Sequence, residues 1–389
     1  MRVGLICLVL AYVLSQFYRA FLAVLTPSLV ADLHMTAEQL ALASNLWFVA
    51  FALMQLPVGE ALDRVGPRLT VGTLLFFVAA GAALFASANG PGAIMAGMAL
   101  IGIGCAPALM TAYFVYARNY PTAVFGTFAG IVAGLGSLGN VASALPFAWA
   151  VEAFGWRMSV WGLAALSLAI SIATAALMRD LPRVEGGHSG SLLDLLRDRR
   201  LWPLFAMMAV CYYPAAALRD LWVGPYARDV FGYGDDRIGQ LTLVMAVTMG
   251  IGNFVYGLLD RYKPQRRAII LWGNLLCAAG ILALWVWPDT GPVPAIALLG
   301  VVGLFGTSFP LVMAYGKGDL PKAMLGRGVT LLNFFGIGAT GIAQAATGQI
   351  YEASSGSPAP DRFALVFLFF GLTLLAGLAA FALGRRKAR

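Results

Sequence analysis

The most constraining feature of this sequence is a series of long apolar stretches separated by short polar gaps. Each stretch has about 20 residues or more, the length that a helix needs to cross the hydrocarbon core of a membrane. Twelve stretches occur, at 3–30, 38–58, 69–88, 92–116, 122–150, 157–178, 201–227, 237–258, 267–287, 292–315, 326–350 and 363–384. The sequence predicts an all-α integral membrane protein with twelve transmembrane helices, the first of them retained because it is too long for a signal peptide.

Composition supports a membrane protein over a soluble enzyme. Of the 389 residues, 60% are hydrophobic and 11% are charged, whereas soluble domains carry roughly 25% charged residues. The net charge of +8 lies in the gaps between apolar stretches, which is typical of membrane orientation, so we expect no nucleic-acid partner. The four cysteines lie within apolar stretches and are expected to pack as small hydrophobic residues.

The basic residues are distributed unevenly between alternate gaps. If both termini are cytoplasmic, 20 Lys and Arg residues face inward and 4 face outward, while Arg19 and Arg219 lie inside helices. Cytoplasmic loops carry an excess of Lys and Arg. The count therefore favours cytoplasmic termini in a multi-pass protein of the inner (plasma) membrane.

The chain repeats itself at an offset of about 200 residues. Arg19 matches Arg219, Gly90-Pro91 matches Gly291-Pro292, and Pro121 and Gly126 match Pro321 and Gly326. These matches predict two pseudo-symmetric six-helix halves, at 1–178 and 201–389. A cytoplasmic linker at 179–200 joins them, and its "LLDLLRDRR" segment is expected to form a short amphipathic helix at the inner surface.

A loop signature follows the second stretch. It reads Gly59-Glu60-Ala61-Leu62-Asp63-Arg64-Val65-Gly66-Pro67-Arg68, and Asp260-Arg261 ends a weaker copy after the eighth stretch. The signature resembles the helix 2–3 loop of the major facilitator superfamily, with Pro67 where that family often has a basic residue. The resemblance covers the whole chain, including twelve spans, both loops and a central linker.

The resemblance implies that these loops close a cytoplasmic gate. The predicted gate residues are Gly59, Asp63, Arg64, Gly66, Arg68, Arg118, Asp260, Arg261 and Lys317. An Asp at an inner helix end can face the positive N-terminus of a neighbouring helix and pair with a cation. By position, Asp63 would pair with Arg118 and Asp260 with Lys317. The alternative is that both are solvated turn residues.

Charged residues inside the spans point to a central site. Arg19, Arg219 and Asp220 are costly in lipid unless they face a cavity or a partner. Consecutive helical residues point about 100° apart, so we expect Asp220 to pair with Arg19 on the symmetric helix rather than with Arg219. An interdomain lock and a contact with substrate both stay open for Arg19.

Three tyrosines complete the predicted substrate site. In the superfamily, helices 1, 4, 7 and 10 line the cavity, which makes Tyr18, Tyr113 and Tyr212 candidates. Hydrogen bonding between helices is an equally good explanation for each of these residues.

A methionine pair raises the possibility of a metal substrate. Met245 and Met249 lie one helical turn apart, and thioethers suit Cu(I). The opening segment also resembles a bacterial copper-importing and riboflavin-transporting branch of the superfamily. The companion His-x-x-x-Met of that branch is absent here, and packing is the alternative role for both methionines.

Together these features predict a secondary transporter that works by alternating access and is driven by a gradient. Arg19 and Arg219 together outweigh the single carboxylate of Asp220, and this net positive charge favours a polar or anionic organic substrate. A Cu(I) importer and a non-transporting receptor are the alternatives. No nucleotide-binding loop or hydrolase motif occurs. We therefore expect a monomeric membrane protein, not an enzyme, whose partners are a small solute or ion and the bilayer, with no cofactor.

Overall fold

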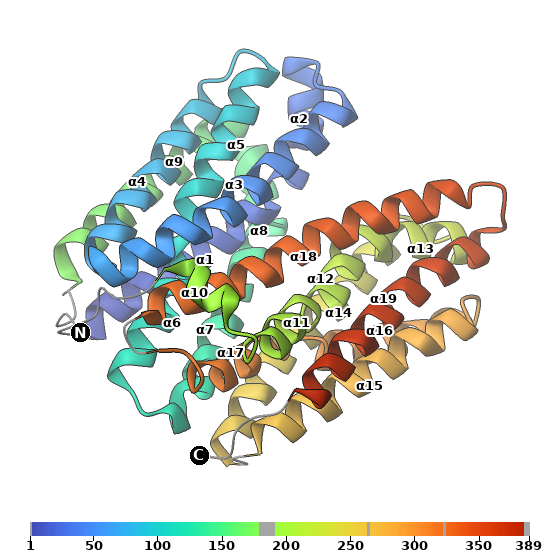
Figure 1. Ribbon diagram of the computed structural model, residues 1–389. Coiled ribbons are helices and arrows are strands. Elements are labelled where there is room, and N and C mark those ends of the chain that lie inside the picture. The colour runs from blue at the N-terminus through green and yellow to red at the C-terminus, as the bar shows by residue number, and fades with distance from the viewer. Residues whose placement is uncertain (1, 179–190, 263–264, 322–323, 385–389) are drawn as a thin grey trace. The chain divides into compact units, whose positions relative to one another are not determined.

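The computed structural model describes residues 2–178, 191–262, 265–321 and 324–384, and within these ranges the regular structure is entirely helical (Figure 1). The helices are α1 Arg2–Ala20, α2 Leu22–Leu33, α3 Ala37–Arg64, α4 Pro67–Ala86, α5 Pro91–Cys105, α6 Pro107–Asn119, α7 Thr122–Ala142, α8 Leu145–Phe154, α9 Trp156–Leu177, α10 Leu192–Arg197, α11 Trp202–Val210, α12 Tyr213–Ala217, η1 Leu218–Trp222, α13 Val223–Phe231, α14 Asp235–Tyr262, α15 Arg266–Val286, α16 Pro292–Phe305, α17 Phe309–Lys317, α18 Leu325–Ala353 and α19 Ala359–Leu383.

The membrane-spanning helices agree with the apolar stretches. Among the described residues, ten helical spans are long and apolar enough to cross a membrane, and α1 with α2, bent by 46°, make an eleventh if the pair is one span. Four short consecutive segments, α11, α12, η1 and α13, occupy the seventh predicted stretch. The prediction of an all-α membrane protein is confirmed, and a twelve-span, two-half architecture is consistent with these helices.

Several spans are interrupted where the sequence predicts one continuous helix, often beside a proline. Pro107, Pro146, Pro214 and Pro310 each lie in the first turn of a helix that follows a break. Proline lacks the N–H that a continuing helix would use, so it is best accommodated where a helix begins. Short breaks of this kind subdivide the fourth, fifth, seventh and tenth spans.

The chain divides into two compact units. Unit 1 comprises Met1–Tyr120, Val132–Gly190 and Leu320–Phe334, and unit 2 comprises Pro121–Ile131, Ser191–Asp319 and Phe335–Arg389. The first part of α18 thus belongs to unit 1, and the first part of α7 belongs to unit 2. The boundaries predicted for the two halves stay a prediction.

The same helix pairs recur in both units. In unit 1, α4 packs on α9 and α5, and α3 packs on α5. In unit 2, α15 packs on α19 and α16, and α14 packs on α16. These are the corresponding pairs under the offset of about 200 residues, as expected for a duplicated six-helix arrangement.

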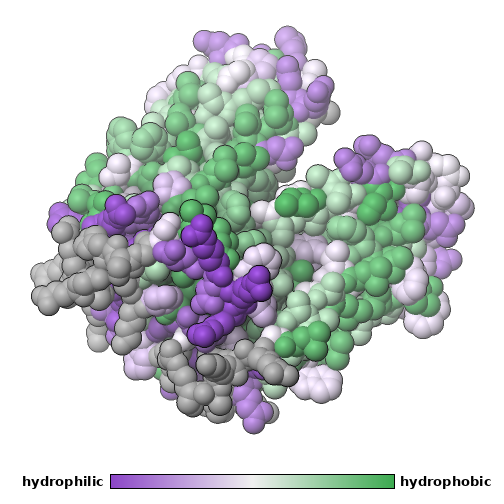
Figure 2. Space-filling view, in the orientation of Figure 1, coloured by the Kyte–Doolittle hydropathy of each residue, from purple (hydrophilic) through white to green (hydrophobic). Residues whose placement is uncertain are grey.

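Hydrophobic side chains cover much of the exposed helix surface in the view of Figure 2. Leu53, Phe76, Trp272 and Ile342 are 56–73% exposed. Such exposure in water would be unfavourable. It is the surface that a chain surrounded by lipid presents.

The predicted linker lies partly outside the described residues, because 179–190 are not described. The described remainder contains the expected short helix, α10. Ser191 and Asp194 form a capping box at its start. The Asp194 carboxylate accepts a hydrogen bond from the Ser191 backbone N–H, and the Ser191 hydroxyl accepts one from the Leu193 backbone N–H.

Candidate functional site

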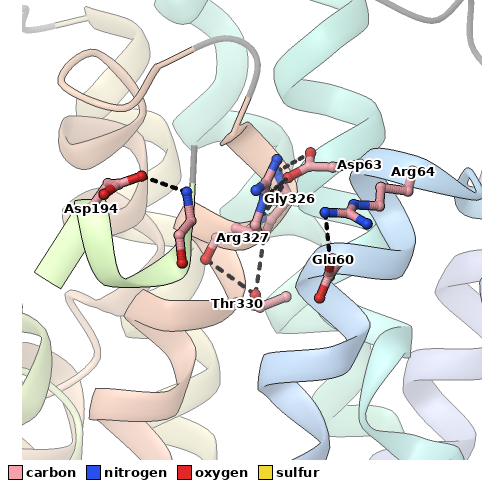
Figure 3. A network of polar contacts seen from close by, with 8 residues as sticks. Glu60, Asp63, Arg64, Asp194, Gly326, Arg327 and Thr330 are labelled. Carbon is pink, nitrogen blue, oxygen red and sulfur yellow. Dashed lines mark hydrogen bonds and ion pairs between the residues drawn. The ribbon is translucent and has the colours of Figure 1, made fainter. Parts of the chain in front are cut away.

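In unit 1, the end of α3 meets the first turn of α18 through Asp63. Its carboxylate accepts hydrogen bonds from the backbone N–H groups of Gly326 at 2.8 Å and Arg327 at 3.1 Å. The Arg327 guanidinium donates to the same carboxylate at 3.0 Å (Figure 3). Both side chains are almost completely buried. The carboxylate therefore neutralises a buried cation and also satisfies the free N–H groups at a positive helix end.

Glycines allow this close approach. A Cβ atom on Gly326 would lie 2.7 Å from Asp63 Oδ1 and 2.8 Å from the Gly59 carbonyl oxygen. A Cβ atom on Gly59 would lie 2.9 Å from Arg327 Cα and would overlap the Thr330 hydroxyl. Such separations are too short for ordinary van der Waals contact. Gly59 of the loop signature is thus required by the backbone of α18.

Unit 2 contains a corresponding arrangement at the end of α14. The buried carboxylate of Asp260 accepts a hydrogen bond from the backbone N–H of Gly126, in the first part of α7, at 2.9 Å. The Thr127 hydroxyl donates to the Gly257 carbonyl at 2.9 Å. A Cβ atom on Gly126 would overlap the Asp260 carboxylate. The two acidic residues therefore make the same kind of contact with helix starts that match in the repeat.

The cations that pair with these carboxylates differ from the ones predicted. Asp63 pairs with Arg327 rather than Arg118, and Asp260 pairs with Arg266 rather than Lys317. The Arg118 guanidinium lies over the Phe114 ring at 5.2 Å, and the Lys317 ammonium lies over the Phe125 ring at 5.0 Å. The Arg327 guanidinium comes from the start of α18, where Asp63 already binds backbone N–H groups, whereas Arg266 is the first residue of α15.

Three other residues of the predicted gate, Gly66, Arg68 and Arg64, have local contacts or conformations at the loop. Gly66, directly before Pro67, has a φ of 103°. Residues with a side chain rarely adopt this conformation. Arg68 donates to the Ala175 carbonyl of α9 at 2.6 Å. Arg64 pairs with Glu60 one turn earlier, where both side chains are about half exposed. Arg261 is exposed at the end of α14, and its contribution to a gate stays a prediction.

Asp220 makes a contact that the sequence analysis did not expect. Its carboxylate forms an ion pair with its neighbour Arg219, at 2.6 Å, inside the π-helical segment η1. The expectation that neighbours cannot pair assumed a regular α-helix. A π-turn changes the angle between consecutive side chains, and the long arginine side chain can curl back toward the aspartate. Both side chains are largely buried, at 13% and 24% exposure.

Arg19 lies in the last turn of α1, directly before the bend at Phe21. Its guanidinium lies over the Phe48 ring of α3 at 5.3 Å. Arg19 belongs to unit 1 and Asp220 to unit 2, so the pairing proposed between them stays a prediction.

Two of the three candidate tyrosines are completely buried. The Tyr18 hydroxyl shares a hydrogen bond of 3.0 Å with the Ser167 hydroxyl of α9, which is the helix-to-helix contact considered as the alternative. Tyr113 is also 0% exposed. Tyr212 is half-buried at the break between α11 and α12, and its ring centroid lies 6.0 Å from that of Phe309. Their roles in binding stay predictions.

Met245 and Met249 are buried in α14, at 0% and 3% exposure. Across the described ranges, no cluster of three or more His, Cys, Asp or Glu side chains that could hold a metal ion occurs. The copper hypothesis therefore stays a prediction that rests on the spacing of the two methionines.

Sequence reasoning missed the ion pairs that Arg327 and Arg266 form with the two acidic residues. Both were counted only as inward-facing charges, because charge counting reports the side of the membrane and not the contact. The repeat did contain a usable signal. Gly126 and Gly326 match at an offset of 200 residues, and each provides the N–H that an acidic residue binds.

Known proteins with similar sequences and folds are transporters. The sequence profile described as Major Facilitator Superfamily matches residues 8–344. A probable sulfoacetate transporter, SauU, of Cupriavidus necator is 24% identical over 72% of this chain and 68% of its own length. A probable L-galactonate transporter of Escherichia coli is 22% identical over 97% of this chain and 88% of its own length.

The fold comparison agrees with the sequence comparison. A crystal structure of a variant of the E. coli fucose:proton symporter, FucP, matches with a TM-score of 0.74 at 17% identity. The match covers 97% of this chain and 98% of that one. Because the family profile extends from the first span into the eleventh, the chain belongs to the Major Facilitator Superfamily.

Proposed function

We propose that this protein is a gradient-driven transporter of small organic anions across the inner membrane, with both termini in the cytoplasm. That it is a secondary transporter of small solutes, and not an enzyme, follows from its family and its relatives. The substrate class, the driving gradient and the gate residues are the proposed parts.

The paired contacts of Asp63 and Asp260 carry the proposal of alternating access. In each unit, an acidic residue at the inner end of one predicted half binds a backbone N–H near the start of a helix that begins in the other half. Two halves that rock against each other must break and re-form such contacts. A charged hydrogen bond to a helix N-terminus is strong enough to hold one state and reversible enough to release it.

The interrupted spans support a central binding site. The first span bends by 46° between α1 and α2, and the seventh span is divided into α11, α12, η1 and α13. These are corresponding helices of the two halves. Discontinuous helices at matching positions are the usual location of substrate and coupling-ion sites in transporters. The ionisable residues inside these spans, Arg19, Arg219 and Asp220, lie at or close to the interruptions.

The charges favour an anion. The two interrupted helices contain two arginines and one carboxylate, and this net positive charge favours an anionic substrate. The names of both curated relatives denote transport of organic anions, sulfoacetate and L-galactonate. A proton gradient is the proposed energy source, with Asp220 as the proton carrier.

Uptake into proteoliposomes tests the proposal. The purified full chain would be given radiolabelled L-galactonate, sulfoacetate, riboflavin and Cu(I), each with and without an imposed pH gradient. We expect accumulation of at least one organic anion that depends on the gradient. Protein-free liposomes and the variant Arg19→Gln are the controls. Accumulation of Cu(I) or riboflavin alone would replace the proposed substrate class, and no accumulation of any probe would contradict transport of these anions.

A further inference from the structure

Gln16 and Asn140 bring two amide side chains together inside unit 1. The Asn140 Nδ2 group donates a hydrogen bond to Gln16 Oε1 at 3.4 Å. The contact joins α1 to α7 within the membrane. Gln16 is three residues before Arg19 on α1, so the two side chains lie on the same face of that helix, with Cβ atoms roughly 5–6 Å apart.

Glycines of α7 fix this arrangement. A Cβ atom on Gly139 would lie 2.9 Å from the backbone nitrogen of Phe17 and 3.0 Å from Gln16 Cβ. A Cβ atom on Gly136 would overlap the ring of Tyr12. The backbones of α1 and α7 are therefore in close contact where the amides meet. This close approach keeps the backbones that carry Gln16 and Asn140 next to each other.

The amide pair leaves hydrogen-bonding capacity unused. One hydrogen bond between two amides consumes one donor and one acceptor, so a second donor and a second acceptor remain, whichever way round each amide lies. In the described part of the chain, Asn140 Oδ1 is buried and has no hydrogen-bond partner. An unpaired buried acceptor is unfavourable, and a ligand that donates a hydrogen bond would satisfy it.

We propose that Arg19, Gln16 and Asn140 form a binding site for a hydroxylated carboxylate. This inference rests on the proposed transport of anions and adds the substrate class. The planar guanidinium of Arg19 binds the carboxylate through two N–H groups. The Gln16 NH₂ group donates to a ligand oxygen, and Asn140 Oδ1 accepts from a ligand hydroxyl one to three carbons from the carboxylate. A hydroxy acid or sugar acid satisfies all three groups.

The competing explanation is that the amide pair only holds the helices together. Amide hydrogen bonds between membrane helices are common and modest in strength. A structural pair would affect stability and would not distinguish one anion from another. Selectivity between matched ligands therefore separates the two explanations.

The experiment measures binding to the purified full chain by titration calorimetry with three probes. Galactonate has a carboxylate and hydroxyls, hexanoate has a carboxylate alone, and galactitol has hydroxyls alone. We expect galactonate to bind about tenfold or more tightly than hexanoate, because the wrong ligand leaves Asn140 Oδ1 unpaired. Galactitol should bind at least as weakly as hexanoate, since it has no carboxylate for the Arg19 guanidinium to bind.

Variants assign the selectivity to the residues. Asn140→Leu should abolish the preference for galactonate over hexanoate. Gln16→Met should reduce the preference and provides a second variant if Asn140→Leu fails to fold. The matched control is Asn253→Leu, because within the described part of the chain the Asn253 amide donates to the Met249 carbonyl of its own helix. This control should keep the preference.

Two failures are distinguishable. Equal binding of hexanoate and galactonate, or a preference that survives Asn140→Leu, would overturn the hydroxylated class and leave anion transport standing. If neither anion binds, or if Arg19→Gln changes the binding of neither, the anion proposal itself is wrong.

Discussion

The Asp63 carboxylate binds the backbone N–H of Gly326 at 2.8 Å and the Arg327 guanidinium at 3.0 Å, and these two contacts serve different purposes. The N–H contact caps α18, while the ion pair neutralises a guanidinium that is buried at 3% residue exposure. A change at Asp63 therefore affects both the helix start and the buried cation.

Replacing Asp63 by Asn should destabilise the protein and slow transport. Arg327 then keeps an amide oxygen but loses its counter-ion, and breaking a buried pair costs about 3 kcal/mol. The double variant Asp63→Asn with Arg327→Gln should recover part of this loss, with a coupling energy of about 1 kcal/mol or more. Thermal unfolding and initial uptake rates across the cycle measure both effects.

Glu60→Gln is the control for this cycle. Glu60 lies on the same turn of α3, and its ion pair with Arg64 is exposed to solvent. Exposed pairs of this kind contribute little, so stability and uptake should stay close to those of the unmodified protein. Additive effects of the Asp63 and Arg327 substitutions would contradict a gate built on their ion pair.

Adding a methyl group to Gly326 or to Gly126 should also disturb the proposed gate. Gly326→Ala places a Cβ atom 2.7 Å from Asp63 Oδ1, and Gly126→Ala places one against the Asp260 carboxylate. Each variant should have a lower unfolding temperature and slower uptake, because the carboxylate must move away from the N–H group it binds. Unchanged uptake in both variants would show that the contacts do not limit transport.

Gly338→Ala is the matched control on the same helix, α18. Nothing lies within 4 Å of a Cβ atom built on Gly338. Alanine is favoured over glycine inside a helix by roughly 1 kcal/mol, so this variant should keep or gain stability. A loss of stability in Gly338→Ala equal to that in Gly326→Ala would point to a general requirement for glycine in α18.

The orientation predicted from the charge count is testable with fusions. A reporter that is active only in the cytoplasm, placed after Lys387 or within 185–191, should give a cytoplasmic signal at both positions. The reason is the 20-to-4 excess of basic residues in the inward gaps. A reporter placed near 289 should give the opposite signal. A periplasmic signal at either of the first two positions would contradict a twelve-span arrangement with both termini inside.

The fold was largely predictable because the backbone N–H and C=O groups of each span must form their hydrogen bonds within the helix. An apolar run of sufficient length therefore predicts a helix without reference to tertiary contacts. The bend at Phe21 was not predictable on these terms, since Ala20-Phe21-Leu22 contains neither proline nor glycine. The break before Pro107 was more accessible, because proline marks a helix start.

The site was predictable only in part. The loop signature identified Asp63 and Asp260, and the general idea of a carboxylate at a helix N-terminus agrees with the contacts found. The choice of Arg118 and Lys317 as partners assumed that cations at helix ends face the carboxylates. Which residue faces Asp63 depends on the packing of α3 against α18, and this packing is not encoded in local spacing.

The ion pair between Arg219 and Asp220 gives the sharpest test of the central charges. Both side chains are largely buried within η1, so Arg219→Gln or Asp220→Asn, each of which breaks this ion pair, should lower the unfolding temperature. The double variant should recover stability, with a coupling energy of about 1–3 kcal/mol. A second cycle with Arg19→Gln and Asp220→Asn measures the pairing predicted from the sequence.

Transport and binding assays of these variants separate a structural ion pair from a proton-coupling site. If Asp220 carries the proton, Asp220→Asn should abolish accumulation driven by a pH gradient and keep exchange of labelled for unlabelled substrate, because exchange needs binding and alternation but no net proton transfer. If Arg19 binds the anion, Arg19→Lys should keep part of the binding that Arg19→Gln loses, since the charge survives without the planar fork. Additive stability effects of Arg219 and Asp220 would show that their ion pair does not hold η1. Accumulation by Asp220→Asn that still follows the pH gradient would assign proton coupling to another group.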